Sequence, residues 1–200
     1  ITKNYYLFVT SLLYCFSTDD KCYKMSYKDY IIEVPDFPVE GVSFKDMSPL
    51  LATPTVFRET IYKMGELVGI KRTQPPYVTQ YPDDWSAVDA RGFIFATALS
   101  YEFGGGIVMC RKKGKLPPPV ISYKYKTEYS EDTLEIKNGS GTAVVVDDVL
   151  ATGGTLQAVN DIAKLAGYEV INNLLFIDLK YVPKVDWFNL DVKSLIQYEI

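Results

Sequence analysis

Apolar residues along the chain follow two patterns, one typical of buried strands and one typical of packed helices. Ala143 to Val146 are four consecutive apolar residues, three of them β-branched, as in a strand buried on both faces of a parallel sheet. Three more strands are predicted at residues 107–110, 169–179 and 193–198. Apolar residues at helical spacing predict helices at residues 55–69, 92–103 and 155–166. Strands that are followed by helices predict an α/β fold.

Polar and small residues follow the central strand at once. Asp147 and Asp148 come directly after Val146, so we expect them at the carboxyl edge of an open α/β sheet, where such folds bind ligands. The next residues, Ala151 to Thr155, make a turn of small residues. Gly153 and Gly154 can adopt positive φ angles there and let a ligand approach the backbone closely.

A helix is predicted to begin where this turn ends. Its apolar face is made by Leu156, Val159, Ala163 and Ala166, and Gly167 fits the position after its last turn. Free amides and the positive end of the helix dipole meet at the N-terminus, which makes an anion site that a phosphate usually occupies. The loop is not a Walker A motif, because the Lys before Ser/Thr is missing. The acids and the loop together predict a ribose phosphate pocket.

Composition limits the other functions that the chain could have. A net charge of −4 argues against nucleic-acid binding, which normally needs a basic face. The chain has no histidine, which excludes Ser-His-Asp and Cys-His catalysis and histidine-based metal sites. Cys15, Cys22 and Cys110 show neither CxxC spacing nor a disulfide framework, so a reduced, cytoplasmic compartment is expected. The length of 200 residues and the 48% hydrophobic content suit one globular domain.

Residues 1–24 differ from the rest of the chain. Their apolar patch, residues 5–16, is too short for a membrane span but fits the core of a signal peptide. Lys3 supplies only a thin basic region before it, and Met25 opens a stretch that reads like a natural start. We therefore favour an N-terminal extension outside the main fold over a targeting signal, expect no membrane association, and place a single domain at residues 25–200.

Two stretches are rich in proline. Pro35, Pro38, Gly41 and Pro49 prevent a long helix in residues 34–51 and predict a shaped loop region there. Residues 71–85 carry three prolines and several polar residues, which predicts a surface loop.

Basic residues gather at two places that follow predicted strands. Arg91 lies where a short strand in residues 86–95 meets a helix; a surface salt bridge is one reading, and a phosphate contact, which suits the guanidinium fork, is the one we prefer. The second place is the run RKKGKLP, with Arg111, Lys112, Lys113 and Lys115. A charge run is usually a solvated face, but directly after a strand of an acidic protein it is also a counter-charge for a diphosphate.

Two stretches of this sequence resemble a known family. Residues 144–155, VVVDDVLATGGT, closely resemble the phosphoribosyl pyrophosphate signature of type I phosphoribosyltransferases, and residues 34–51, VPDFPVEGVSFKDMSPLL, resemble the hood of the branch that uses adenine. The resemblance implies an open, mostly parallel twisted sheet flanked by helices, with a small N-terminal hood at about residues 30–52. The alternative for residues 144–155 is an ordinary strand–helix turn with incidental acids.

The same resemblance implies how the base and the pyrophosphate would be held. Phe44 would stack on the purine ring, and backbone groups near Ser43 to Lys45 would read its edge. Without the surrounding match, Phe44 would be taken for a core residue. Residues 86–95, SAVDARGFIF, resemble the pyrophosphate-binding turn, which implies a role for Arg91 and a strained peptide between Asp89 and Ala90, with cis as one candidate conformation.

Two further segments carry implied site residues. RKKGKLP is close to the family's RKxGKLP, in which the residue matching Arg111 reaches the neighbouring subunit's site in a homodimer; Lys112 and Lys115 complete the basic loop. KTEYSEDTLEI resembles the mobile catalytic loop, with Glu128 as the catalytic acid and Tyr129 beside it. On composition alone, other acids compete for this role, namely Glu131, Asp132 and Glu135.

Two segments depart from the family's pattern. Residues 71–85 are longer than the corresponding connection, and residues 180–190, KYVPKVDWFNL, replace a usual charged segment. The second departure leaves the packing of the C-terminal part open.

The reaction implied by the resemblance is the conversion of adenine and 5-phosphoribosyl 1-pyrophosphate to AMP and pyrophosphate. Asp147 and Asp148 would hold the ribose hydroxyls, and Ala151, Thr152, Gly153, Gly154 and Thr155 would hold the phosphate. Mg²⁺ is expected, held mainly by substrate oxygens and water, with no protein metal ligands. The alternatives are a phosphoribosyltransferase for hypoxanthine/guanine, xanthine or orotate, and a non-catalytic regulator that binds phosphoribosyl pyrophosphate.

Overall fold

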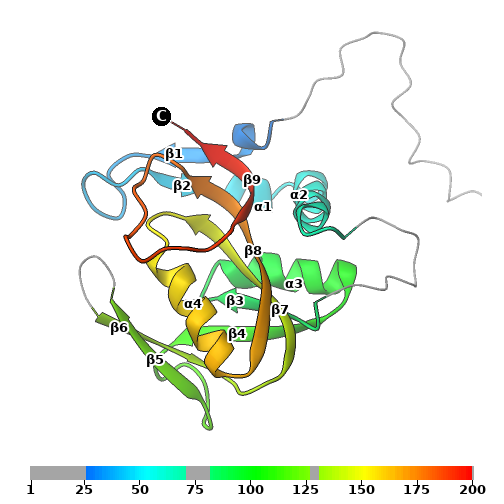
Figure 1. The fold of residues 1–200 in the computed structure, drawn as a ribbon. Helices are drawn as coiled ribbons and strands as arrows, with labels where there is room; N and C mark the ends of the chain where they lie inside the picture. Colours follow the sequence, from blue (N-terminus) through cyan, green and yellow to red (C-terminus); the bar gives the residue numbers. More distant parts are fainter. Residues whose placement is uncertain (1–25, 71–81, 127–130, 200) are drawn as a thin grey trace, which may run out of the picture.

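The computed structural model describes residues 26–70, 82–126 and 131–199, and these residues are organised around one large sheet (Figure 1). Its strands have the order β5 (Ile121–Lys126), β6 (Glu131–Ile136), β4 (Gly106–Lys112), β3 (Asp84–Val88), β7 (Gly141–Leu150), β8 (Tyr168–Leu179) and β9 (Lys193–Tyr198). From β4 to β9 all neighbours pair in parallel, whereas β5 and β6 form an antiparallel hairpin on β4. The mostly parallel sheet predicted from the sequence is confirmed.

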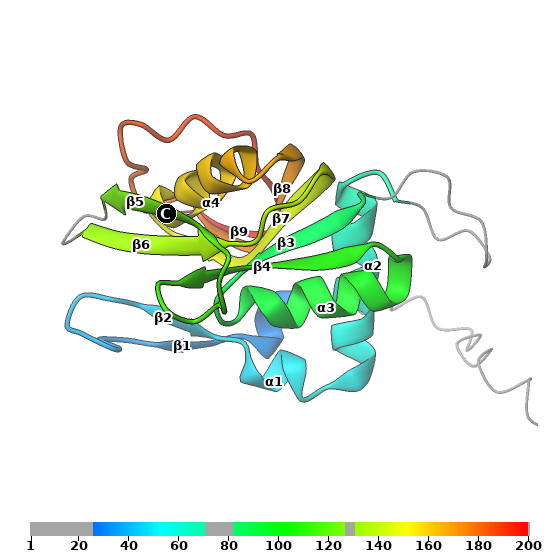
Figure 2. The ribbon, with the colours of Figure 1, turned by 90° about the horizontal axis from the view of Figure 1, so that it is seen from below.

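Helices cover both faces of this sheet (Figure 2). One face carries α2 (Pro54–Leu67) and α3 (Gly92–Phe103), whose apolar side chains share a core with Trp85, Val144 and Phe176. The opposite face carries α4 (Gly154–Leu165), which packs on a second core that includes Val145 and Leu175. Alternate residues of β7 thus enter different cores, as expected for a strand buried on both faces.

The three predicted helices are present, with ends within two residues of the predicted bounds. Pro54 occupies the first turn of α2, and Gly69, with a φ of 86°, follows its last turn. Gly104 ends α3 and Gly167, with a φ of 100°, follows α4. These glycines adopt backbone angles that other residues avoid, which is why the helices stop there.

The prediction of a surface loop reaching Trp85 is wrong at its C-terminal end. Trp85 lies in β3, is fully buried, and donates from Nε1 to Gly104 O at 2.7 Å. Burial of the indole ring and this hydrogen bond outweigh the polar character of the residues before it. Residues 71–81, the rest of the predicted loop, lie outside the described residues.

The strand predicted at residues 107–110 is only half buried. Val108 and Cys110 are buried, but Ile107 and Met109, on the other face of β4, are 42% and 43% exposed. The apolar run indicated a strand correctly but gave no information on which face would be covered.

The N-terminal part of the described chain forms the hood. It consists of the 3₁₀ helix η1 (Tyr27–Tyr30), the antiparallel strands β1 (Ile32–Val34) and β2 (Phe44–Asp46), and the short helix α1 (Ser48–Leu51). Lys45 fixes it to the sheet: the side chain is buried, its Nζ lies 2.8 Å from Glu33 Oε1, and it lies 4.5 Å from the centre of the Tyr198 ring on β9. The predicted absence of a long helix is confirmed.

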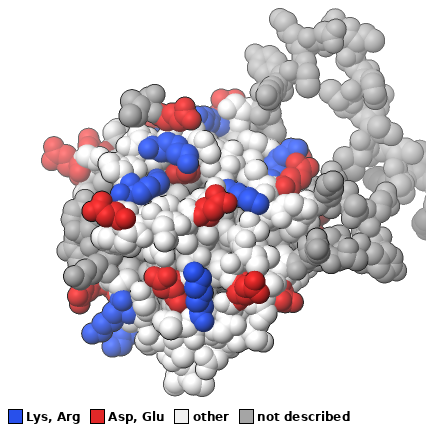
Figure 3. Space-filling model, in the orientation of Figure 1, with Lys and Arg blue, Asp and Glu red and all other residues white. Residues whose placement is uncertain are grey.

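Charged side chains of both signs are interspersed on the face seen in Figure 3. Within the described ranges, no helix is long and apolar enough to cross a membrane.

Candidate active site

The pocket forms where β7 loses one of its neighbours. The sequence predicted that the strand would end before the acid pair. It instead runs through Asp147 and Asp148 to Leu150. On one side β8 pairs with it as far as Leu150, whereas on the other side the pairing with β3 ends at Val146. The acid pair therefore keeps its place at the carboxyl edge of the sheet, beside a gap left by β3.

A cavity of about 260 Å³ occupies this edge. Seven of the predicted site residues line it: Arg91, Asp147, Asp148, Ala151, Thr152, Gly153 and Thr155. Its wall also includes residues that the sequence did not single out, among them Val149, Leu150 and Leu175. Residues predicted from separate stretches of the chain thus meet in one pocket.

The start of α3 lies directly against the acid pair. A Cβ atom on Gly92 would lie 2.9 Å from Val146 O and 3.1 Å from Asp147 Oδ1, so only glycine allows this approach. Asp147 Oδ1 also accepts a hydrogen bond from the Asp148 amide at 2.9 Å. Burial, and then the neighbouring Asp148 charge, raise the pKa of Asp147 well above its usual value.

Arg91 links the acid pair to the hood. Its Nε lies 2.7 Å from the buried Asp148 Oδ2, and its guanidinium carbon lies 4.9 Å from the centre of the Phe44 ring. Phe44 lies outside the pocket wall but is connected to it by this cation–π contact. The peptide between Asp89 and Ala90, just before Arg91, is cis.

Residues 151–155, the loop predicted to hold the phosphate, are called the phosphate loop below. Positive φ angles were predicted at Gly153 and Gly154, and only Gly153 adopts one. Gly153 has a φ of 88°, but Gly154 is already the first residue of α4 and does not adopt a positive φ. Thr155 makes a hydrogen bond with Tyr125, from the β5–β6 hairpin. The N-terminus of α4 lies at the pocket, because Gly153 and Thr155, on either side of its first residue, line the wall.

The basic run lies beside the pocket and not in its wall. Arg111 Nε lies 3.0 Å from Asp89 Oδ2, Lys112 Nζ lies 2.9 Å from Asp132 Oδ2, and Lys115 is exposed. Ser43 and Lys45 also lie outside the pocket wall, and Lys45 Nζ donates to Ser43 Oγ at 3.2 Å inside the hood. The predicted contact of this stretch with the base involves its backbone groups and stays a prediction.

The predicted catalytic acid falls in a segment that the structure leaves out. Glu128 and Tyr129 lie outside the described residues, between β5 and β6. Two of the rival acids have structural partners: Asp132 pairs with Lys112, and the buried Glu135 accepts from the Gly114 amide at 2.8 Å. Glu131 is exposed at the start of β6.

Sequence reasoning missed the residues behind the phosphate loop. Lys184 Nζ donates to Ala151 O at 2.6 Å, and the Phe188 ring packs against Gly153. Both residues come from the segment that departs from the family's pattern, and no local motif marks them. Only the fold brings that segment to residues 151–155.

Three carboxylates line the pocket, those of Asp89, Asp147 and Asp148, and Asp89 is paired with Arg111. Across the described part of the chain, no three metal-ligating side chains come together. Asp147 and Asp148 suit Mg²⁺, which commonly binds one or two protein carboxylates and takes its other ligands from substrate phosphates and water.

Known proteins share both the sequence and this fold. Residues 86–182 match the phosphoribosyl transferase domain family. Adenine phosphoribosyltransferases of Rhodospirillum rubrum and Bdellovibrio bacteriovorus are 36% and 38% identical, over 88% and 87% of this chain and 99% and 100% of theirs. The crystal structure of adenine phosphoribosyltransferase from Thermoanaerobacter pseudethanolicus superposes with a TM-score of 0.75 at 35% identity, covering 86% of this chain and 98% of that chain.

A further crystal structure contains ligands. The enzyme from Saccharomyces cerevisiae, complexed with an imino-altritol bisphosphate and adenine, has a TM-score of 0.71 at 26% identity and covers 84% of this chain and 98% of that chain.

Proposed function

The chain belongs to the adenine phosphoribosyltransferases, and on this premise we propose that it converts adenine and 5-phosphoribosyl 1-pyrophosphate to AMP and pyrophosphate. The observation that carries the proposal is that the acid pair, the phosphate loop and Arg91 line one pocket. Phe44 of the hood contacts Arg91 beside it. The acids suit ribose hydroxyls, the loop amides suit the 5-phosphate, and the aromatic ring suits a purine.

Asp147 and Asp148 stabilise the sugar during transfer. Positive charge develops on the ribose as the bond from C1 to pyrophosphate stretches, and enzymes accelerate such a step by favouring the developing charge. Two carboxylates at the edge of the sheet hold the hydroxyls and supply negative potential there. Burial and the Asp148 charge raise the pKa of Asp147, so a positive charge that develops nearby would favour its ionised form.

Arg91 serves the leaving pyrophosphate. Its guanidinium contacts Asp148 and Phe44, the residues that we assign to the ribose and the base. Substrate binding therefore releases the guanidinium from both, and it turns to the diphosphate, whose oxygens match its planar donors. Lys112 and Lys115, on the neighbouring basic run, add positive charge at this end of the site.

Glu128 assists proton transfer at the base, with Tyr129 beside it. This role rests on the resemblance of residues 126–136 to the family's catalytic loop and on the structural partners of Asp132 and Glu135, which favour Glu128 among the acids of the hairpin. Closure of the hairpin over the pocket would exclude water and protect the sugar cation from hydrolysis.

Mg²⁺ completes the substrate. Held mainly by substrate oxygens and water, it would supply charge neutralisation at the leaving group. Of the carboxylates that line the pocket, those of Asp147 and Asp148 are the protein groups that could join its coordination, directly or through water.

The functional unit that we propose is a homodimer. One face of β4 carries Ile107, Met109 and Arg111, and both apolar side chains are exposed. Tyr101 on α3 is also exposed, at 90%. A second subunit would cover this apolar surface and bring Arg111 to the neighbouring site. Arg111 must first leave Asp89 of its own chain, 3.0 Å away. Sedimentation velocity tests the dimer, and Met109→Glu should dissociate it.

The compartment that we propose is the cytoplasm. Cys110 is free and buried, and the spacing of the other two cysteines gives no disulfide framework.

Parallel assays of product formation test the proposed function. We expect AMP from adenine and 5-phosphoribosyl 1-pyrophosphate, with little IMP, GMP, XMP or orotidylate from the other bases. Faster turnover of hypoxanthine than of adenine would show that the hood does not select adenine. Tight binding of 5-phosphoribosyl 1-pyrophosphate without turnover of any base would favour a regulator.

A further inference from the structure

The segment between β8 and β9 forms the outer wall of the phosphate loop. Val185 N donates to Thr152 O at 2.9 Å, and Lys184 Nζ donates to Ala151 O at 2.6 Å. The Phe188 ring packs against Gly153, where it occupies the space that a side chain would need. Three consecutive residues of the loop, Ala151, Thr152 and Gly153, therefore contact this segment.

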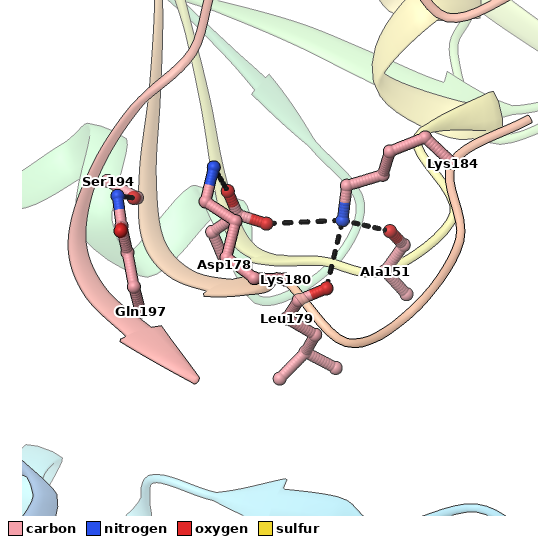
Figure 4. Close-up of polar contacts among 7 residues, drawn as sticks. All are labelled: Ala151, Asp178, Leu179, Lys180, Lys184, Ser194 and Gln197. Carbon is pink, nitrogen blue, oxygen red and sulfur yellow. Dashed lines mark hydrogen bonds and ion pairs between the residues drawn. The ribbon is translucent and has the colours of Figure 1, made fainter. Parts of the chain in front are cut away.

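Lys184 is fixed by three acceptors at once (Figure 4). Besides Ala151 O, its Nζ contacts Leu179 O at 3.0 Å and Asp178 Oδ1 at 3.1 Å. The Asp178 side chain is only 2% exposed, and its second oxygen lies 2.7 Å from Lys180 Nζ. Asp178 is the last residue but one of β8 and is in register with Leu150 of β7. Lys184 thus connects the end of β8 to the loop that follows the neighbouring strand β7.

Holding a carbonyl also sets the direction of the amide that shares its peptide plane. In a planar trans peptide, the C=O and the N–H point in opposite directions. Lys184 and Val185 hold the carbonyls of Ala151 and Thr152 toward the C-terminal segment, so the amides of Thr152 and Gly153 point away from it. Both residues line the pocket, and among the described residues neither amide has a hydrogen-bond acceptor.

We propose that Lys184 is a positioning residue that aims the amides of the phosphate loop at the substrate phosphate. The inference deepens the proposed function and rests on it, since it assigns the 5-phosphate to these amides. Lys184 acts through Ala151 and contacts no substrate. Its cation is balanced by Asp178, so the ion pair fixes the loop without placing an unpaired charge in the wall.

Lys180 provides a matched control. It pairs with the same carboxylate, at 2.7 Å, but makes no polar contact with the loop within the described part of the chain, and its side chain is 46% exposed against 24% for Lys184. Lys184→Met and Lys180→Met each remove one charge next to Asp178 and keep most of the apolar stem. Only the first releases Ala151 O.

The test compares these two variants in calorimetric titrations with ribose 5-phosphate and in steady-state assays. For Lys184→Met we expect the ribose 5-phosphate Kd and the KM for 5-phosphoribosyl 1-pyrophosphate to rise about tenfold, because hydrogen bonds from a charged group are lost. The KM for adenine should stay unchanged. Lys180→Met should keep wild-type values. Asp178→Asn, which weakens the hold on Lys184 but keeps the shape, should give a smaller change in the same direction and covers the case in which Lys184→Met does not fold.

Two results would overturn the proposal: unchanged ribose 5-phosphate binding by a folded Lys184→Met or Asp178→Asn variant, or an equal loss of adenine and ribose 5-phosphate binding in both lysine variants. Failure of the wild-type chain itself to bind ribose 5-phosphate would instead refute the proposed phosphate site, and the role of Lys184 with it.

Discussion

Arg91 Nε lies 2.7 Å from Asp148 Oδ2, while the same guanidinium covers the Phe44 ring at 4.9 Å. One side chain thereby joins the sugar end of the pocket to the hood. Under the proposed function, substrate has to separate these contacts before Arg91 can reach the diphosphate, which would link occupation of the proposed ribose and base positions to capture of the leaving group.

Asp148→Asn tests the sugar end of this arrangement. The amide keeps the shape of the side chain but removes its charge, so the KM for 5-phosphoribosyl 1-pyrophosphate should rise about tenfold, as expected for a lost hydrogen bond to a charged group. Far-UV circular dichroism should remain that of wild type. The control is Asp161→Asn on α4, which contacts Tyr123 and Gln157 outside the pocket. Wild-type kinetics in Asp148→Asn would make the acid pair merely structural.

Glu128→Gln tests the catalytic acid. Loss of proton transfer should lower kcat at least about tenfold, because general acid–base catalysis typically contributes 100- to 10,000-fold. The KM for 5-phosphoribosyl 1-pyrophosphate should stay within about twofold of wild type, since ground-state binding is unaffected. Glu131→Gln, at the start of the same hairpin's second strand, serves as control and should keep its kcat. An unchanged kcat in Glu128→Gln would refute the assignment.

Asp147→Asn should stabilise the unliganded protein at neutral pH. The pKa of Asp147 is raised on folding by burial and by Asp148, so its ionised form is less favourable in the folded than in the unfolded chain. This cost is absent below the unfolded pKa, grows as the pH rises toward the folded pKa, and is complete above it. Thermal unfolding should therefore give a higher Tm for the variant at pH 7 and a difference that shrinks as the pH falls toward about 4. A lower Tm at pH 7 would contradict the raised pKa.

How much could be read from the sequence depended on whether the information was local. Asp147, Asp148, the loop and α4 are contiguous, so their order along the chain already determined their place at one sheet edge. The contact of Lys184 with Ala151 joins residues 33 positions apart, and no motif marks it. The burial of a strand face is equally non-local, because coverage of Ile107 depends on which element packs there.

Trp85 shows the same limit and carries a stability prediction. The ring is fully buried between the sheet and α3 and bonds to Gly104 O, although the residues before it suggested a loop. Trp85→Ala should lower the free energy of unfolding by about 3 to 5 kcal/mol, the usual cost of deleting a buried large aromatic side chain. Urea denaturation measures this value. Leu165→Ala, at a 62% exposed residue at the end of α4, should change it by less than about 0.5 kcal/mol, and equal losses in both variants would contradict the packing described.

A crystal structure of the full chain with AMP tests the central claim most directly. The account predicts the 5-phosphate against the amides of Thr152 to Thr155, the ribose hydroxyls on Asp147 and Asp148, and the adenine ring on Phe44. A phosphate bound anywhere else, or a base away from the hood, would contradict it.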